Sequence, residues 1–158
     1  MLDQLQYSVG GHWTAGGRGA VAAEGVEKTI EFSAPLEFHG EVGFWTPEQF
    51  LLAAVASCFT TTFRAIAGNS KFDPVALDVT VEGTLTRNAG GYDFTAVVIR
   101  PRLVVRDESD RTRAIRLLEK TERGCLVARS LRCAVTMEAA VKSLAHASDG
   151  EGVTAPHV

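Results

Sequence analysis

A helix predicted from Pro47 to about Ala67 constrains the fold of this chain more than any other feature. Thr46 suits the N-cap, proline suits the first helical position, and Glu48 in the first turn suits the helix dipole. Gly68-Asn69 follows as a stop signal. Phe50–Ala56 is apolar on every face, so this segment must be buried all round, at the centre of a domain or at a subunit interface.

Strands surround this helix in the sequence. Before it, Tyr7–Trp13 and Ala20–Glu24 flank a glycine-rich turn, and Val26–Ser33 alternates as a strand does. After it, Val75–Arg87 alternates between apolar and polar residues and returns through a glycine turn as Tyr92–Val105, which predicts a hairpin. Strands in blocks, rather than strictly alternating with helices, indicate the α+β class.

The last third of the chain is predicted to be mainly helical. A second helix begins at Ser109 or Asp110 and ends at Gly124, a short helix covers about Leu126–Leu131, and a last strand covers Ala134–Ala139. Pro101 within the second strand of the hairpin suggests an edge strand or a bend, because proline cannot donate to a ladder.

Composition sets the class of protein. The chain has 158 residues, of which 46% are apolar and 22% charged, and we expect one domain over residues 1–144 and a disordered tail at 145–158. A net charge of −3 argues against nucleic acid or an anionic membrane as partner. We find no window near the roughly 18 apolar residues of a membrane span and no signal peptide. Three cysteines do not form a secreted framework, so we expect a cytoplasmic protein.

Two isolated cysteines carry the candidate chemistry. Cys58 lies where the apolar helix turns polar, and Cys125 follows a helix-ending glycine at the start of a helical turn, where free amides would favour a thiolate. Neither belongs to a metal-ligand pattern, so we predict no metal. If the fold brings the two together, reversible thiol oxidation follows, with Cys58 attacking and Cys125 resolving. Cys133 is interpreted as structural.

Arg18, in a glycine turn, and Glu48 complete the candidate set. A guanidinium can hold a thiolate, and Glu48 can orient it through an ion pair. Glu48 and Cys58 are ten residues apart on one helix, roughly 15 Å along its axis. One copy of the chain therefore has difficulty building a single site from both, whereas a two-fold dimer could place Glu48 of one subunit near Cys58 of the other.

Three segments resemble the OsmC/Ohr family (osmotically inducible protein C and organic hydroperoxide resistance protein). They are Gly-Gly-Arg18-Gly, Trp-Thr-Pro-Glu48-Gln-Phe-Leu-Leu-Ala-Ala-Val-Ala-Ser-Cys58-Phe, and Gly-Cys125-Leu-Val-Ala-Arg-Ser-Leu. Their order and the strands around them match the family to about Val141. The Ohr branch usually has proline after the resolving cysteine, so the leucine here is nearer the OsmC or OsmC-like branches.

This resemblance implies an intertwined homodimer, with antiparallel sheets packed around two long buried central helices. It also implies a thiol peroxidase without a bound cofactor, in which Cys58 is peroxidatic, Cys125 resolving, Arg18 the thiolate-activating arginine and Glu48 its carboxylate partner. The arginine and glutamate come from the chain opposite the reactive cysteine. Organic hydroperoxides would be the substrates and an external dithiol, such as dihydrolipoamide, the reductant.

Three points remain open at this stage. A non-catalytic dimeric protein that binds a small apolar ligand, or a thiol-redox sensor, fits the same scaffold. Phe50, Phe59 and Trp45 are candidates to line the approach of an apolar substrate. The loop Phe38-His39-Gly40-Glu41, just before the key helix, is a candidate lid.

Overall fold

The computed structural model describes residues 3–144, so the predicted tail at 145–158 lies outside the described residues. The chain divides into two compact units, one up to Leu51 and one from Leu52 onward. Helix α1 (Pro47–Asn69) begins in the first unit and continues into the second. The prediction of a single domain over residues 1–144 stays a prediction.

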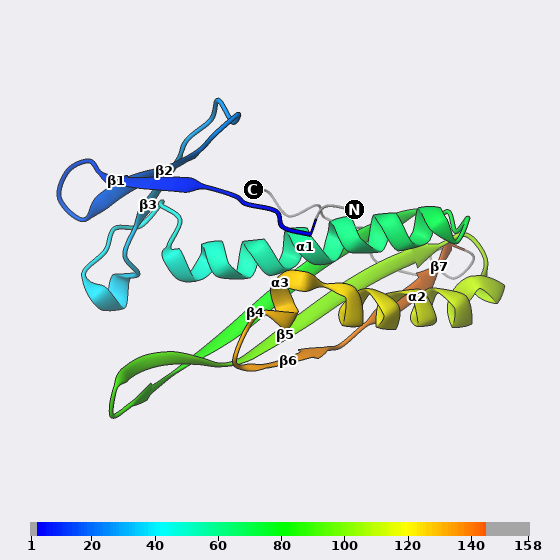
Figure 1. The fold of residues 1–158 in the computed structure, drawn as a ribbon. Helices are drawn as coiled ribbons and strands as arrows, with labels where there is room; N and C mark the ends of the chain where they lie inside the picture. The colour runs from blue at the N-terminus through cyan, green and yellow to red at the C-terminus, as the bar shows by residue number, and fades with distance from the viewer. Residues whose placement is uncertain (1–2, 145–158) are drawn as a thin grey trace. The chain divides into compact units, whose positions relative to one another are not determined.

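The first unit is built on a three-stranded antiparallel sheet (Figure 1). Its strands overlap the three extended segments predicted from the sequence, and Arg18 at the start of the middle strand lies opposite Ser33 at the end of the third. Beyond the sheet, Ser33 N–H donates to the carbonyl of Trp45 at 2.8 Å, which ties the chain just before α1 to the sheet. The elements before α1 are β1 (Val9–Trp13), β2 (Arg18–Ala23), β3 (Ile30–Ser33) and η1 (Leu36–Phe38).

The start of α1 is fixed by a cap and by aromatic packing. Thr46 and Gln49 exchange side-chain-to-backbone hydrogen bonds of 3.0 and 3.3 Å, which is a capping box. Phe50, in the first turns, stacks on Trp45 with ring centroids 5.7 Å apart and meets Phe32 edge-on at 6.1 Å. The predicted helix start is confirmed, and the aromatic cluster joins it to β3.

The second unit contains a mixed four-stranded sheet. The predicted hairpin forms its body, with β4 (Ala76–Asn88) antiparallel to β5 (Gly91–Val105). The predicted last strand is divided into β6 (Ala134–Met137) and β7 (Ala140–Ser143), and both pair parallel to β5. The expectation of antiparallel sheets is therefore wrong for this unit. The helices between β5 and β6 supply the long crossover that a parallel pair needs.

Pro101 does not mark an edge, because β5 is the strand that pairs with all three others. It is buried and lies opposite Val79 of β4. On the other side, β6 pairs with residues 96–99 of β5 and β7 with residues 102–105. Pro101 thus falls in the gap between these two stretches, where the parallel ladder is interrupted and a missing N–H is tolerated.

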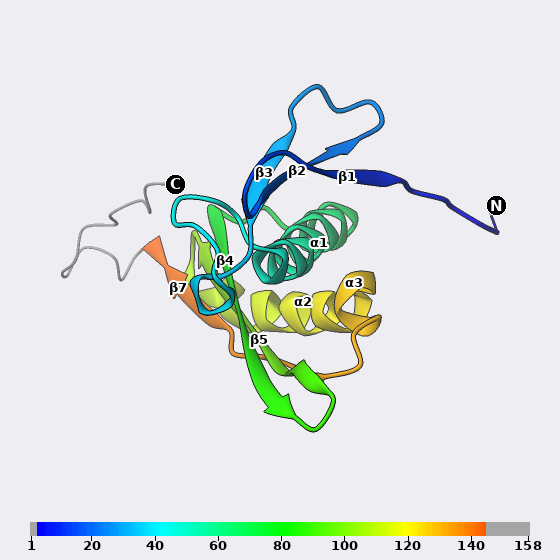
Figure 2. The ribbon, with the colours of Figure 1, turned by 90° about the vertical axis from the view of Figure 1, so that its left-hand side faces the viewer.

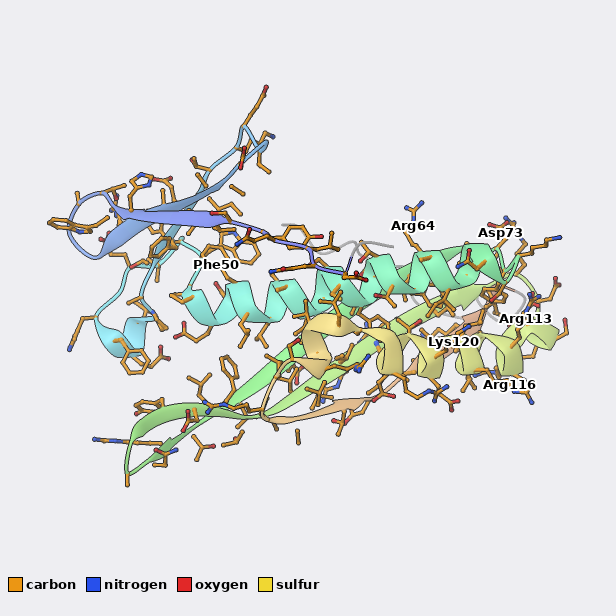
Figure 3. All side chains as sticks on the ribbon, in the orientation of Figure 1. Phe50, Arg64, Asp73, Arg113, Arg116 and Lys120 are labelled. Carbon is orange, nitrogen blue, oxygen red and sulfur yellow. The ribbon has the colours of Figure 1, made fainter. Side chains whose placement is uncertain are left out.

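Helices η2 (Glu108–Asp110), α2 (Arg111–Gly124) and α3 (Leu126–Arg129) cover this sheet beside α1 (Figure 2). Phe59 and Phe63 of α1, Leu118 of α2 and Ile99 and Leu103 of β5 belong to one buried core. At the far end of α1, Arg113 donates to the Ser70 carbonyl and lies over the Phe72 ring at 5.4 Å, and Figure 3 labels Arg113 and Asp73 at this end of the unit.

The long helix is less buried than the sequence predicts. Within the described chain only Val55, Phe59, Phe63 and Ala67 of α1 are buried, along one face. Among the described residues, α1 is also the one helix long and apolar enough to cross a membrane, which corrects the expectation that no such segment exists. Core helices of soluble proteins meet the same criterion, so it assigns no membrane.

Candidate active site

The second unit brings Cys58 and Cys125 together. Cys58 lies midway along α1 and is partly buried, whereas Cys125 is fully buried between α2 and α3 and donates its N–H to the Thr121 carbonyl at 2.9 Å. The two thiols lie close enough for each to shift the pKa of the other. Gly124 faces α1, since a Cβ there would lie 3.4 Å from the Thr62 side chain, in ordinary van der Waals contact. The two helices therefore approach closely beside the thiols.

Hydrogen bonds favour the thiolate of Cys58. Burial is the largest single effect and raises the pKa of this thiol, but the Val127 N–H, the Cys125 side chain, the Thr62 hydroxyl and the Leu126 N–H all stabilise the charged form. Together they bring the pKa of Cys58 below its ordinary value. The Cys58 sulfur lies 3.9 Å from the Thr62 hydroxyl oxygen. Cys58 is therefore the more readily ionised thiol of the pair.

Cys125 has the opposite tendency. Burial raises the pKa of its thiol; the Ala128 amide opposes this, and the hydrogen bond with Cys58 adds to the increase. The Ala128 and Val127 amides do favour a thiolate at Cys125, as expected, but burial outweighs them and leaves its pKa raised. The Leu126 and Val127 amides also stabilise a thiolate at Cys58. The proton of the pair therefore resides on Cys125 while Cys58 ionises first.

Cys133 stands apart from this pair. It is partly buried just before β6, and all three cysteines are free thiols. Over residues 3–144, no group of three or more His, Cys, Asp or Glu side chains is arranged to hold a metal ion.

Arg18 and Glu48 both lie in the first unit, but the structure does not pair them. Arg18 donates from Nε and Nη2 to one oxygen of Glu41, at 3.0 and 2.5 Å, and its guanidinium lies over the Phe44 ring at 4.6 Å. One buried carboxylate oxygen of Glu48 has no hydrogen-bond partner within the part of the chain that the structure describes. Sequence reasoning missed Glu41 because no local pattern connects two residues that are 23 positions apart.

The aromatic residues proposed to line a substrate approach have other neighbours. Phe59 is fully buried in the core of the second unit, while Phe50 and Trp45 stack on each other in the first. The second unit also has a cavity of about 450 Å³ near the end of α1. Its walls include Phe63, Arg64, Phe72, Asp73 and Leu77 and neither thiol of the pair.

Comparisons with known proteins agree on one family. The family model described as OsmC-like protein matches residues 39–140. The peroxiredoxin OsmC of Escherichia coli strain K12 is 27% identical over 136 residues, which cover 84% of this chain and 94% of that protein. Two solved structures share the fold. An OsmC-like protein of unknown function from Vibrio cholerae has a TM-score of 0.77 at 20% identity, covering 86% of this chain and 99% of that one. An organic hydroperoxide resistance protein from Legionella pneumophila has a TM-score of 0.69 at 22% identity, covering 88% and 99%.

Proposed function

The chain belongs to the OsmC-like protein family, and from that premise we propose that it is a cysteine peroxidase that reduces organic hydroperoxides to alcohols. The observation that carries this proposal is the Cys58–Cys125 pair, whose thiols influence each other and whose pKa values move in opposite directions. One sulfur is prepared to attack and the other is kept protonated beside it.

The reaction begins with the Cys58 thiolate attacking the terminal oxygen of the hydroperoxide. The O–O bond breaks, the alkoxide takes up a proton and leaves as an alcohol, and Cys58 becomes a sulfenic acid. Cys125 then loses its proton and attacks the Cys58 sulfur, which releases water and forms a disulfide. An external dithiol, of which dihydrolipoamide is an example, reduces the disulfide in two exchange steps and becomes oxidised itself. No bound cofactor takes part in the cycle.

We propose that the active form is a homodimer with shared sites, in which Arg18 and Glu48 of one copy act on Cys58 of the other. Two observations support a second copy. Most of the apolar helix α1 is not buried within one chain. Large apolar side chains of the first unit, such as Tyr7, Val9 and Trp13, are well exposed as well. A partner chain would cover such surfaces, as it does in obligate dimers.

The test is a thiol count before and after one equivalent of an alkyl hydroperoxide, followed by peptide mapping. We expect the three free thiols of the chain to fall to one, with Cys58 linked to Cys125. Cys58→Ser should reduce turnover to background, and Cys125→Ser should permit a single turnover and then stop. A Cys58→Ser variant that retains turnover contradicts the assignment.

A second candidate is a binding protein or a thiol-redox sensor on the same scaffold. The cavity near the end of α1 has apolar walls and the charged side chains of Arg64 and Asp73. Such a cavity favours a binding protein over a purely structural one. Sustained consumption of hydroperoxide with excess dithiol separates the two, since an enzyme cycles and a binder or sensor does not. We propose the cytoplasm as the compartment, because the cycle depends on reducing dithiols.

A further inference from the structure

The guanidinium of Arg18 contacts two partners within the first unit, the Glu41 carboxylate and the Phe44 ring. Its Nε and Nη2 both donate to one carboxylate oxygen of Glu41, at 3.0 and 2.5 Å. The Phe44 ring lies beneath it at 4.6 Å, a distance typical of cation–π contact. A long, flexible side chain is thereby kept in one orientation, and the carboxylate that does so is Glu41.

Ser33 connects the backbone on either side of this ion pair. The side chain of Ser33 is buried, and its hydroxyl donates to the Gly17 carbonyl at 3.3 Å while accepting the Glu41 N–H at 2.9 Å. Gly17 directly precedes Arg18 in the turn before β2. One hydroxyl therefore holds the turn that carries the cation and the loop that carries the anion.

The path of that loop is set by Gly40. A Cβ at this position would lie 1.5 Å from the carbonyl oxygen of Ala34, so only glycine lets the loop pass so close to the end of β3. Its N–H donates to the Pro35 carbonyl at 3.0 Å. The backbone before Glu41 is thus fixed by close packing as well as by the Ser33 hydroxyl.

From this network we infer that Glu41 is a positioning residue for Arg18, in addition to the role proposed for Glu48. The hydrogen bond with Glu41 raises the pKa of Arg18, and the hydrogen bond with Arg18 lowers the pKa of Glu41, so both groups stay charged over the working range of pH. Glu48 shares no such contact, since its buried oxygen is unpartnered among residues 3–144.

The consequence rests on the proposed function, in which Arg18 stabilises the thiolate of Cys58 in a second copy of the chain. Glu41 touches neither sulfur nor peroxide in that scheme and acts only through Arg18. Without it, the guanidinium stays charged but is no longer held in place. The Cys58 thiolate then loses an oriented donor, and its reactivity at neutral pH falls.

The experiment measures the rate of iodoacetamide alkylation of Cys58 from pH 5 to 9, resolved by peptide mapping, alongside kcat/KM for an alkyl hydroperoxide. For Glu41→Gln we expect both quantities to fall about tenfold at pH 7, with the alkylation profile displaced to higher pH. Glu41→Asp, which keeps the charge, should recover part of the loss. Glu37→Gln removes an exposed carboxylate from the same loop and serves as the matched control, with no change expected.

A Glu41→Gln profile that coincides with the wild type, or a faster reaction, overturns the inference. So does a result in which Arg18→Ala displaces the profile and Glu41→Gln does not. If Glu41→Gln fails to fold, Glu41→Asp is the test. A wild-type alkylation profile for Glu41→Asp, together with a displaced profile for Glu48→Gln, would assign the positioning of Arg18 to Glu48 alone. If the wild-type protein consumes no hydroperoxide, the proposed function is refuted instead. The alkylation profile of Cys58 still tests whether Glu41 positions Arg18.

Discussion

Replacing Cys125 by alanine should make Cys58 a poorer nucleophile, although the peroxide never touches Cys125 in the first step. The Cys125 side chain is one of the donors that lower the pKa of Cys58. The thiolate of Cys58 is present above that lowered pKa and is lost as the pH falls through it. Removing the donor moves this loss to higher pH, so less thiolate remains at neutral pH.

The expected size follows from the strength of one hydrogen bond. A buried hydrogen bond to a charged group contributes about 1.5–3 kcal/mol, but a thiol is a weak donor. Cys58 is only partly buried, so solvent screens the interaction further. We therefore expect about 1 kcal/mol, which corresponds to about a fivefold lower rate of Cys58 alkylation at pH 7.

The assay is the pH dependence of iodoacetamide alkylation at Cys58, with peptide mapping to separate the three cysteines. Cys125→Ser keeps a hydrogen-bond donor and should stay close to the wild type, which separates the loss of the donor from the loss of the sulfur. Cys133→Ala lies outside the pair and should change nothing. A Cys125→Ala profile identical to the wild type, or one displaced to lower pH, would refute the reasoning.

Three further predictions concern assembly and packing. Mixing inactive Arg18→Ala and Cys58→Ser subunits should restore about a quarter of wild-type turnover after subunit exchange, because about half of the dimers are mixed and each mixed dimer contains one intact shared site. No recovery of turnover would place both residues in the same chain's site. Gly40→Ala should prevent folding or lower the thermal midpoint sharply. Gly124→Ala, where a Cβ meets only ordinary contacts, should be neutral or stabilise the protein by up to about 1 kcal/mol in urea titrations. Equal thermal midpoints for the two variants would contradict the packing argument. Leu118→Ala should cost about 2–5 kcal/mol in the same titrations, and a loss under 1 kcal/mol would show that this core position can collapse.

Local signals in the sequence predicted most of the elements. Thr46-Pro47 gave the start of α1, and the strict alternation after Val75 gave both strands of the hairpin, because caps and a period of two depend only on neighbouring residues. The two cysteines were predicted as a pair from their surroundings, and the structure does place their side chains in contact.

What the sequence could not predict depends on contacts between distant segments. Pro101 suggested an edge strand because the sequence shows only that its own strand lacks one N–H. The gap between β6 and β7, which tolerates this missing N–H, is created by the pairing of both strands with β5. Glu41 had no local signal, because its partner Arg18 is set by the register of β2 on β3. The apolar residues on every side of α1 predicted that the whole helix is buried. Within one chain, the helix is buried along one face only.

The opposite pKa displacements of Cys58 and Cys125 have a further consequence for oxidative damage. In the proposed cycle, Cys125 would stay reduced and available, because a neutral thiol reacts with peroxides far more slowly than a thiolate. The sulfenic acid proposed to form on Cys58 would then have a reduced sulfur beside it from the moment it forms. Condensation competes directly with a second peroxide molecule, and the irreversible sulfinic and sulfonic acids become slow side products. The pair thus limits its own inactivation at high peroxide concentration.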